Sequence, residues 1–332
     1  MQLFFSIVLS VMGLFLIVTA FAGWYMYRFA IVRNPKLQKD AWHDEPKTFA
    51  DLTEEDMAKI VRDVHYLRDF PRERITIESH DGLKLAGHLF AVENPRGIVI
   101  MAHGYRSSAP FDFSGAVQDF NAMDFSCLLI DQRAHGYSEG KYIGFGATER
   151  YDVVNWAKYC ENRWPELPVV MDGVSMGAAT VVMGCSVGYP KNVRAIIADC
   201  GYTTPGAICK RTLKRWFKLP PFPVYYAAKV FVKLMAGYDL DGVSTEDSIR
   251  KMLRENPIPV LFAHGKRDDF VPPEMSEENH RVFENNGLSE IFLSENADHG
   301  LAYVRDKAGY TEAILRLFEK EKIKDRESPF FP

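Results

Sequence analysis

The stretch that decides the fold reads PVVMDGVSMGAATVVMG at residues 168–184. It begins as a short apolar run of strand length and continues as a helical pattern rich in Ala and Gly. Between the two halves, Gly173-Val-Ser175-Met-Gly177 matches the pattern G-x-S-x-G, which by itself arises by chance in roughly one chain in ten. A strand, a sharp turn and a helix in immediate succession form the setting in which this pattern exposes a reactive serine. We therefore expect Ser175 to project over the edge of a sheet.

A serine hydroxyl is a poor nucleophile unless a base takes its proton and an acid orients that base. Among the nine histidines, His299 is the predicted base, because it lies in the loop between the last strand pattern and the final helix. Asp268 follows the apolar run 259–263 and is the predicted acid. Its neighbour Asp269 and the earlier Asp199, at the end of the preceding strand pattern, remain alternatives.

Attack on a carbonyl creates an oxyanion, which needs two backbone N–H donors. The sequence predicts Met176, directly after the serine, as one donor. Tyr105, in the loop that follows the apolar run 97–102, is the predicted second donor. His103, in the same loop, is expected to shape the backbone rather than to transfer protons.

Strand-like and helix-like patterns alternate from about residue 71 onward, after a helical pattern at 53–70 that Thr53 and Asp56 are placed to cap. Apolar strands that alternate with helices predict a mostly parallel sheet covered by helices on both faces. A turn signal at 80–82 predicts an antiparallel hairpin at its edge. The strand patterns cover 74–79, 83–91, 97–102, 126–130, 168–174, 193–199, 259–263 and 290–293, and later helical patterns cover 148–163, 176–187 and 301–322.

The alternation breaks between residues 201 and 256. KLPPFP at 218–223 divides this section into two helical pieces, at 205–217 and 224–236. We predict a small helical cap inserted over the carboxyl edge of the sheet at about 203–256, with a long surface crossover as the alternative. Its apolar side chains would pack on the core or form an acyl pocket open to a membrane. Its basic side chains would face solvent or anionic lipid.

The N-terminus carries a different kind of segment. No charged residue occurs between Leu3 and Tyr27, and a helix of that length rises about 37 Å, enough to cross a hydrocarbon core of roughly 30 Å. Trp24 and Tyr25 stand near its end, where aromatic rings favour the membrane interface. We predict an uncleaved anchor over residues 1–33, with a signal peptide cleaved near Ala20-Phe-Ala22 and a buried globular helix as alternatives.

Basic residues follow the apolar segment, at Arg28, Arg33, Lys36 and Lys39. Positive charge on this side predicts that the rest of the chain stays in the cytoplasm. Residues 34–70 are expected to form a linker and an amphipathic helix, and residues 71–325 the main domain.

Composition narrows the class of protein. Hydrophobic residues make up 47% of the 332 residues and charged residues 25%, which is typical of a chain with a real core. The net charge of −4 offers no basic surplus for nucleic acid. The five cysteines lack C-x-x-C spacing and indicate free thiols rather than a disulfide framework or a zinc site. No metal site is expected.

Five motifs in fixed order carry a specific resemblance. They are HGY at 103–105, DQRAHGYS at 131–138, GVSMG at 173–177, HGxxDxxVP at 264–272 and DHG at 298–300. Together they resemble the serine α/β-hydrolase superfamily, and within it the membrane-anchored bacterial hydrolases related to prolyl-oligopeptidase-type and lysophospholipase-like enzymes. The one departure is Ala134, where many relatives carry glycine. We read Asp131 and Arg133 as structural.

The resemblance implies an eight-stranded α/β-hydrolase sheet, no cofactor, and hydrolysis of an ester or thioester through an acyl-enzyme. A peptidase or amidase and an acyltransferase use the same apparatus and remain open, and a non-catalytic membrane-anchored binding module is the alternative from another class. The expected partners are a small acyl substrate, with lipid as one option, and the membrane. The substrate-binding residues are not identified from the sequence.

Overall fold

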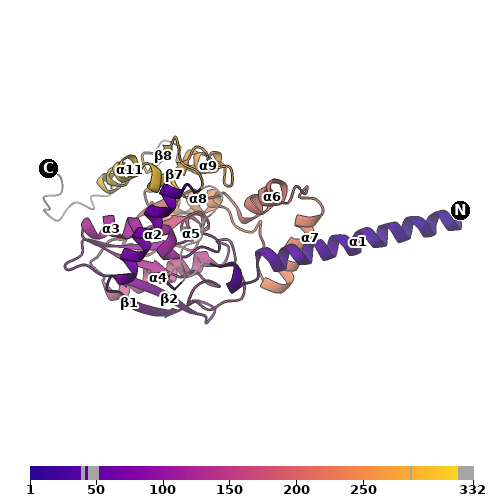
Figure 1. The fold of residues 1–332 in the computed structure, drawn as a ribbon, viewed down its shortest axis with the longest axis horizontal. Helices are drawn as coiled ribbons and strands as arrows, with labels where there is room; N and C mark the ends of the chain where they lie inside the picture. Colours follow the sequence, from indigo (N-terminus) through magenta and orange to yellow (C-terminus); the bar gives the residue numbers. More distant parts are fainter. Residues whose placement is uncertain (39–41, 44–51, 285, 321–332) are drawn as a thin grey trace.

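The computed structural model describes residues 1–38, 42–43, 52–284 and 286–320 (Figure 1). The predicted linker residues 39–41 and 44–51, and the end of the predicted domain after residue 320, lie outside the described residues. One long helix extends away from a rounded body in which helices surround a sheet.

The central sheet has eight strands in the order β1-β2-β4-β3-β5-β6-β7-β8. The second strand pairs antiparallel with β1 and β4, and all other neighbouring pairs are parallel. The predicted parallel sheet with an antiparallel hairpin at one edge is therefore confirmed. The strands are β1 Glu73–Glu78, β2 Lys84–Phe90, β3 Gly97–Ala102, β4 Phe125–Ile130, β5 Val169–Val174, β6 Val193–Asp199, β7 Val260–Gly265 and β8 Ser289–Ser294.

Helices cover both faces of this sheet. One apolar layer joins the sheet to α4 (Glu149–Arg163), α5 (Met176–Gly184) and α8 (Thr245–Glu255). The opposite layer joins it to α3 (Ala109–Ala122) and α11 (Lys307–Lys320). The helix predicted over 301–322 is broken at Asp306 into α10 (Ala302–Arg305) and α11. A further helix, α9 (Glu274–Arg281), lies between β7 and β8.

The first two long helices have different surroundings. Helix α2 (Glu54–Asp69) begins with a capping box in which Thr53 and Asp56 each bond the other's backbone N–H, as predicted. Helix α1 (Gln2–Ala30) has an eighteen-residue apolar window that is not buried in the structure, so it is not a core helix of the described protein. A single 3₁₀ turn, η1 (Pro35–Leu37), follows it.

The predicted cap consists of α6 (Pro205–Arg215), α7 (Val224–Phe231) and a short π-helical turn, η2 (Val232–Ala236). These elements form an apolar cluster with the end of α1 and one side of α5. Helix α8 also falls inside the predicted insertion, but its Ile249 and Met252 are buried in the core layer. The cap is therefore smaller than the insertion, and it lies beside the C-terminal part of α1, next to the rounded body (Figure 1).

Candidate active site

The turn between β5 and α5 holds Ser175 in a strained conformation, with φ 55° and ψ −112°. The flanking glycines are required by close backbone approach. A Cβ at Gly177 would lie 1.8 Å from the carbonyl oxygen of Ala102, and a Cβ at Gly173 would lie 2.4 Å from the carbonyl carbon of Gly177. The N–H of Ser175 donates to the carbonyl of Asp199 at 2.8 Å. Contacts within the chain therefore fix where the serine points.

The structure brings the three predicted side chains together. The Ser175 Oγ lies 2.9 Å from Nε2 of His299, and Nδ1 of the same ring lies 2.6 Å from Oδ2 of Asp268. These residues come from the loops after β5, β8 and β7, which meet at the carboxyl edge of the sheet. The serine hydroxyl can donate to Nε2 while Nδ1–H donates to the carboxylate, which is the tautomer that a general base requires.

Electrostatics strengthen this row. Burial of His299 disfavours its charged form, but the neighbouring Asp268 carboxylate outweighs burial and raises the pKa of the imidazole above 6.5. Burial likewise acts to raise the pKa of Asp268, and His299 and the hydrogen bonds from the two histidines overcome it, so that the pKa falls below 3.8. The acid is thus held as a carboxylate beside the base.

The two alternative acids are placed differently. Asp269 is exposed and forms an ion pair with Arg215 of the cap. Asp199 is 2% exposed at the end of β6, and its Oδ1 has no hydrogen-bond partner among the described residues. Among the three candidates, it is Asp268 that hydrogen-bonds His299.

A second histidine, for which no role was predicted from the sequence, holds the acid from its other side. The Nε2 of His264 lies 3.0 Å from Oδ2 of Asp268, and its Nδ1 lies 2.7 Å from the hydroxyl of Ser276. The other carboxylate oxygen, Oδ1, accepts the backbone N–H groups of Phe270 and Val271 at 2.9 and 2.8 Å. The signal was present in the motif HGxxD, because position 264 stands four residues before the acid.

The loop after β3 presents a candidate oxyanion donor. The N–H of Gly104 donates to Asp112 at 2.7 Å, and the N–H of Arg106 donates to Nε2 of His135 at 3.0 Å. Tyr105 stands between these two residues in the chain, and the N–H groups on either side of it already donate hydrogen bonds. Met176 is the first residue of α5, where N–H groups have no intrahelical acceptor. Both positions remain predicted donors.

His103 has the environment that loop shaping requires. It is fully buried, its Nδ1 lies 2.8 Å from the carbonyl of Gly104, and its Nε2 lies 3.2 Å from the N–H of Gln132. Burial lowers its pKa below 6.5. A neutral ring that donates from Nδ1 and accepts at Nε2 joins the loop after β3 to the loop after β4.

The motif at 131–138 is a structural brace. Arg133 reaches Asp152 of α4 at 2.6 Å and Asp81 of the hairpin turn at 2.9 Å. Asp131 accepts the N–H of Tyr137 at 2.9 Å, and a Cβ at Gly136 would lie 2.4 Å from its carboxylate. Ala134 adopts the left-handed region at φ 61° without a glycine.

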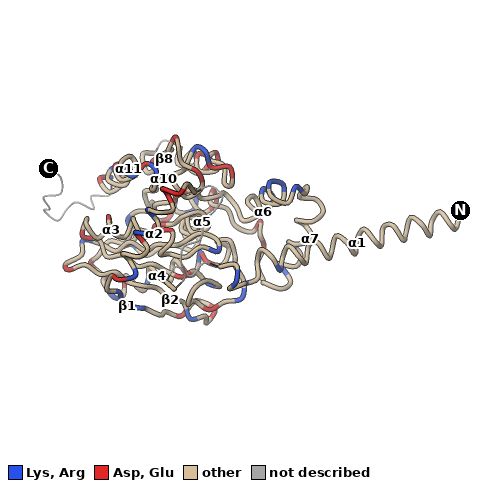
Figure 2. Tube along the Cα trace, viewed as in Figure 1, with Lys and Arg blue, Asp and Glu red and all other residues tan. Residues whose placement is uncertain are grey.

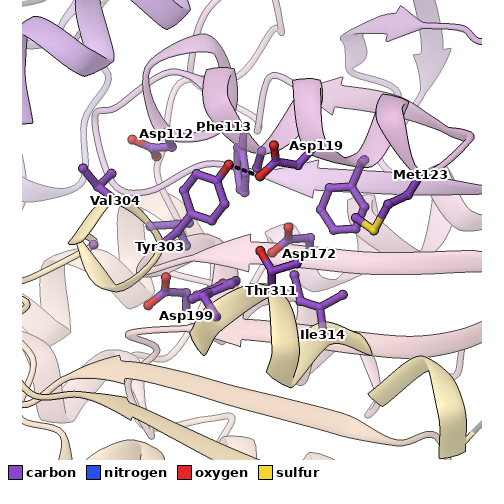
Figure 3. Close-up of a pocket in the computed structure, with 15 residues that line it drawn as sticks. Asp112, Phe113, Asp119, Met123, Asp172, Asp199, Tyr303, Val304, Thr311 and Ile314 are labelled. Atoms are coloured by element: carbon purple, nitrogen blue, oxygen red, sulfur yellow. Dashed lines mark hydrogen bonds between the residues drawn. The ribbon is translucent and has the colours of Figure 1, made fainter. Parts of the chain in front are cut away.

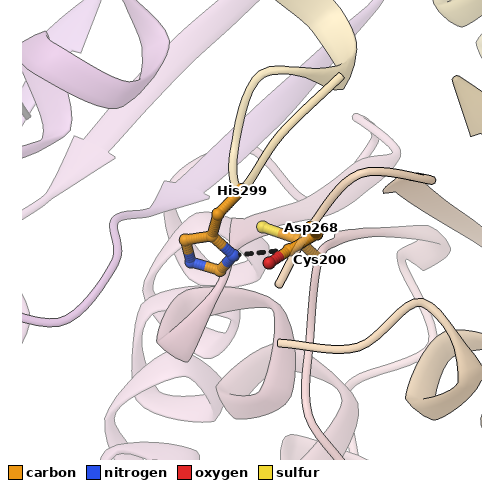
Figure 4. Close-up of side chains that lie close together, drawn as sticks. All are labelled: Cys200, Asp268 and His299. Atoms are coloured by element: carbon orange, nitrogen blue, oxygen red, sulfur yellow. Dashed lines mark hydrogen bonds and ion pairs between the residues drawn. The ribbon is translucent and has the colours of Figure 1, made fainter. Parts of the chain in front are cut away.

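Cys200 lies beside Asp268 and His299 (Figure 4). Burial raises the pKa of this thiol well above 9.0. The thiol is therefore neutral, and it lines the site rather than acting as a thiolate ligand. Both carboxylate oxygens of Asp268 already accept hydrogen bonds. The group is therefore better suited to proton transfer than to metal binding.

A small cavity lies behind the site, between α3 and the segment from Gly300 to Ile314 (Figure 3). Its volume is about 30 Å³, which is room for a water molecule but not for an acyl chain. Asp172 and Asp199 line it, and burial raises the pKa of both, to about 6 for Asp199. This cavity is therefore too small to be the substrate pocket.

Comparison with known proteins agrees with this fold. A family model described as serine aminopeptidase, S33, matches residues 93–257. An uncharacterized Bacillus subtilis protein, YqkD, is 26% identical over 245 residues, covering 73% of this chain and 78% of its own. A monoacylglycerol lipase of Mycolicibacterium smegmatis is 30% identical over 181 residues, covering 52% and 59%. An esterase structure from Pyrococcus furiosus has a TM-score of 0.61 at 23% identity, covering 84% of this chain and 97% of that one.

A strained serine after β5, an acid after β7 and a histidine after β8, on a sheet of this order, define the class of α/β-hydrolases. The chain belongs to the serine α/β-hydrolase superfamily. At 23% identity, the esterase structure supports the fold rather than a particular substrate.

Proposed function

We propose that this protein is a membrane-anchored serine esterase that cleaves a carboxylic ester or thioester through an acyl-enzyme. The observation that carries the proposal is the hydrogen-bonded row from Ser175 through His299 to Asp268. The similarity to a monoacylglycerol lipase, and to a thiohydrolase of Aspergillus aculeatus that is 31% identical over 125 residues (36% of this chain, 38% of its own), supports acyl substrates.

In the first half of the reaction, Ser175 Oγ attacks the carbonyl carbon while Nε2 of His299 takes the hydroxyl proton. The oxyanion that forms accepts the N–H groups of Tyr105 and Met176, each worth about 3–4 kcal/mol. Asp268 stabilises the imidazolium. The ring then returns its proton to the leaving oxygen or sulfur, and the serine ester remains.

In the second half, His299 takes a proton from water, which attacks the serine ester. Collapse of the second tetrahedral intermediate returns the proton to Ser175 and releases the carboxylic acid. No metal ion or cofactor takes part in this scheme.

A peptidase is the second candidate, because the matching family model is described as a serine aminopeptidase. The same row of side chains can cleave an amide. A panel of p-nitrophenyl acyl esters of increasing chain length, run beside aminoacyl p-nitroanilides, separates the two activities. A higher kcat/KM on the anilides would replace the esterase proposal.

The nucleophile is tested with a fluorophosphonate probe on the full chain in detergent. The wild type should be labelled, and Ser175→Ala should lose both labelling and about 10⁶-fold in kcat. The matched control is Ser186→Ala, two residues beyond the end of α5, which should retain both. Labelling that persists in Ser175→Ala would move the nucleophile elsewhere.

We further propose that α1 crosses the membrane and leaves the catalytic body in the cytoplasm. The helix is long and apolar enough, and Arg28, Arg33 and Lys36 follow on the same side. Resistance to carbonate extraction and protection from external protease in intact cells are expected. A smaller mature protein released from the membrane would instead identify the segment as a signal sequence.

A further inference from the structure

The cap carries an apolar stripe that faces away from the body. Phe222, Tyr226, Val230 and Leu234 follow one another at intervals of four residues, with exposures of 68%, 52%, 55% and 74%. The opposite side of the same turns is buried, through Tyr225, Ala228 and Val232. A helix that met only water on its outer side would carry polar residues there. The stripe therefore needs an apolar environment outside this chain.

The end of α1 fixes where the stripe lies. A Cβ at Gly23 would lie 2.5 Å from Cβ of Ala227, so the two helices touch at this point. One turn further along both helices, the rings of Tyr27 and Phe231 stack at 6.4 Å. The helices α1 and α7 thus run in the same direction.

This shared direction sets the depth of the cap. The segment before α7, including Phe222, lies toward the N-terminal, apolar part of α1, and Figure 1 shows the α6–α7 connection on that side. If α1 spans a bilayer, this part of the cap enters the same apolar layer. The proposed anchor and the stripe then form one continuous apolar surface.

Charge around the stripe fits a lipid surface. Lys214, Lys218 and Lys233 are exposed on the cap, and basic residues gather on α6 beside an α1 that is uncharged up to Arg28 (Figure 2). Long lysine side chains can keep their ammonium groups at phosphate level while their stems lie in the apolar layer. A binding site for a partner protein would not need to align with the end of a membrane helix.

A row of rings leads from the cap to the catalytic histidine. Trp216, 61% exposed, stacks on Phe270 at 4.8 Å, and Phe270 meets the ring of His299 edge-on at 4.9 Å. The next residue, Phe217, touches α1, where its ring meets that of Phe29 at 5.8 Å. Aromatic contacts thus connect the last turns of α1 and α6 with the site.

We propose that the cap is seated in the lipid bilayer and that the substrate is a membrane-resident acyl amphiphile, taken laterally from the lipid layer past Trp216 and Phe270. This inference rests on the proposed esterase function and names its substrate class. The bilayer supplies the apolar cover that the stripe lacks in the structure.

The seating is tested by depth-dependent quenching, which does not depend on catalysis. Phe222→Cys and Tyr66→Cys, the latter on α2 and also exposed at 51% in the wild type, are labelled with bimane in the full chain. Both are reconstituted in phosphatidylcholine vesicles with and without brominated acyl chains. Bromine should quench the label at position 222 by half or more and leave the label at 66 unchanged. Equal, weak quenching at both positions would overturn the seating.

The substrate class is tested with two esters. Monooleoylglycerol in vesicles is compared with soluble p-nitrophenyl butyrate, using Phe222→Asp with Leu234→Asp, and Tyr66→Asp as control. A charge in the apolar layer should lower kcat/KM on the vesicle ester by tenfold or more and leave the soluble ester within about twofold. An equal loss on both esters would overturn lateral delivery. Quenching at 222 in a protein that hydrolyses neither ester would retain the seating and refute the esterase.

Discussion

The turn at Ser175 and the cap at Phe222 differ in where the contacts of their side chains come from. Around the serine, every constraint comes from within the chain, because glycines admit close backbone contacts and the acid is held from four directions. Around the cap, large apolar side chains remain exposed, and the contacts with the body and with α1 cover only the opposite side. The proposed catalytic row therefore keeps its geometry through contacts within the chain. The proposed bilayer seating would instead make the cap depend on what surrounds it.

The sharpest test of the self-contained region separates two adjacent acids. Asp268→Asn should lower kcat by about 10⁴-fold, because an amide cannot hold the required tautomer of His299 or stabilise its charge. Asp269→Asn removes an exposed ion pair with Arg215 and should change kcat by no more than about threefold. Steady-state kinetics on p-nitrophenyl butyrate measure both, and the opposite ranking would reassign the acid.

A smaller loss is expected when the acid keeps its charge and loses one support. His264→Asn removes the hydrogen bond to Asp268 and should lower kcat by about 10–100-fold, the value of a hydrogen bond to a charged group. His280→Asn, at a histidine that pairs with Ser289 at 2.8 Å, is the control. To distinguish positioning from folding, KM and the melting temperature should stay close to wild type while kcat falls. A parallel loss of melting temperature would make His264 merely structural.

The pH dependence tests the electrostatics of the row. Because His299 acts as a base only when unprotonated, its raised pKa means that kcat/KM should fall on acidification through an apparent pKa above 6.5. In Asp268→Asn the attraction is gone and burial remains, so the pKa of the ring should fall below 6.5. NMR titration of the His299 imidazole measures both proteins. An unchanged value would show that the carboxylate does not set it.

The smallest effect is expected where the cap meets α1. Gly23→Leu places a side chain against Ala227 and should separate α1 from α7, since no Cβ fits there. Hydrolysis of p-nitrophenyl butyrate should stay within about twofold, and hydrolysis of monooleoylglycerol in vesicles should fall severalfold. Gly13→Leu, at a position with no atom within 4 Å of the added Cβ, should change neither rate. A loss of activity on the soluble ester would show that the contact between α1 and α7 also supports the catalytic residues.

Two contacts limit the independence of these regions. The hydroxyl of Tyr105 donates to the carbonyl of Ala30 at 2.9 Å, and the guanidinium of Arg106 binds the carbonyl of Phe29. The last turn of α1 therefore touches the loop that is predicted to supply an oxyanion donor. Removing residues through 33 should disturb this loop more than shortening the helix before Trp24.

Local patterns predicted a large part of the fold. The strand at 97–102 and the strand at 193–199 were placed at their observed bounds, and the capping of α2 followed from Thr53 and Asp56. Helices α3, α8 and α9 were not predicted. The last helix was predicted to continue through Asp306, because the apolar periodicity continues there. Its break at this residue depends on tertiary packing.

The amino-acid sequence alone determined the serine turn, the order of the strands along the chain and the apolar N-terminal segment, because each depends on residues that are neighbours or at a fixed spacing. The tertiary structure decided which acid hydrogen-bonds His299, that His264 supports it, and that α7 lies against α1. These are contacts between residues far apart in the chain, and their geometry is set by the packing of whole elements rather than by local preference.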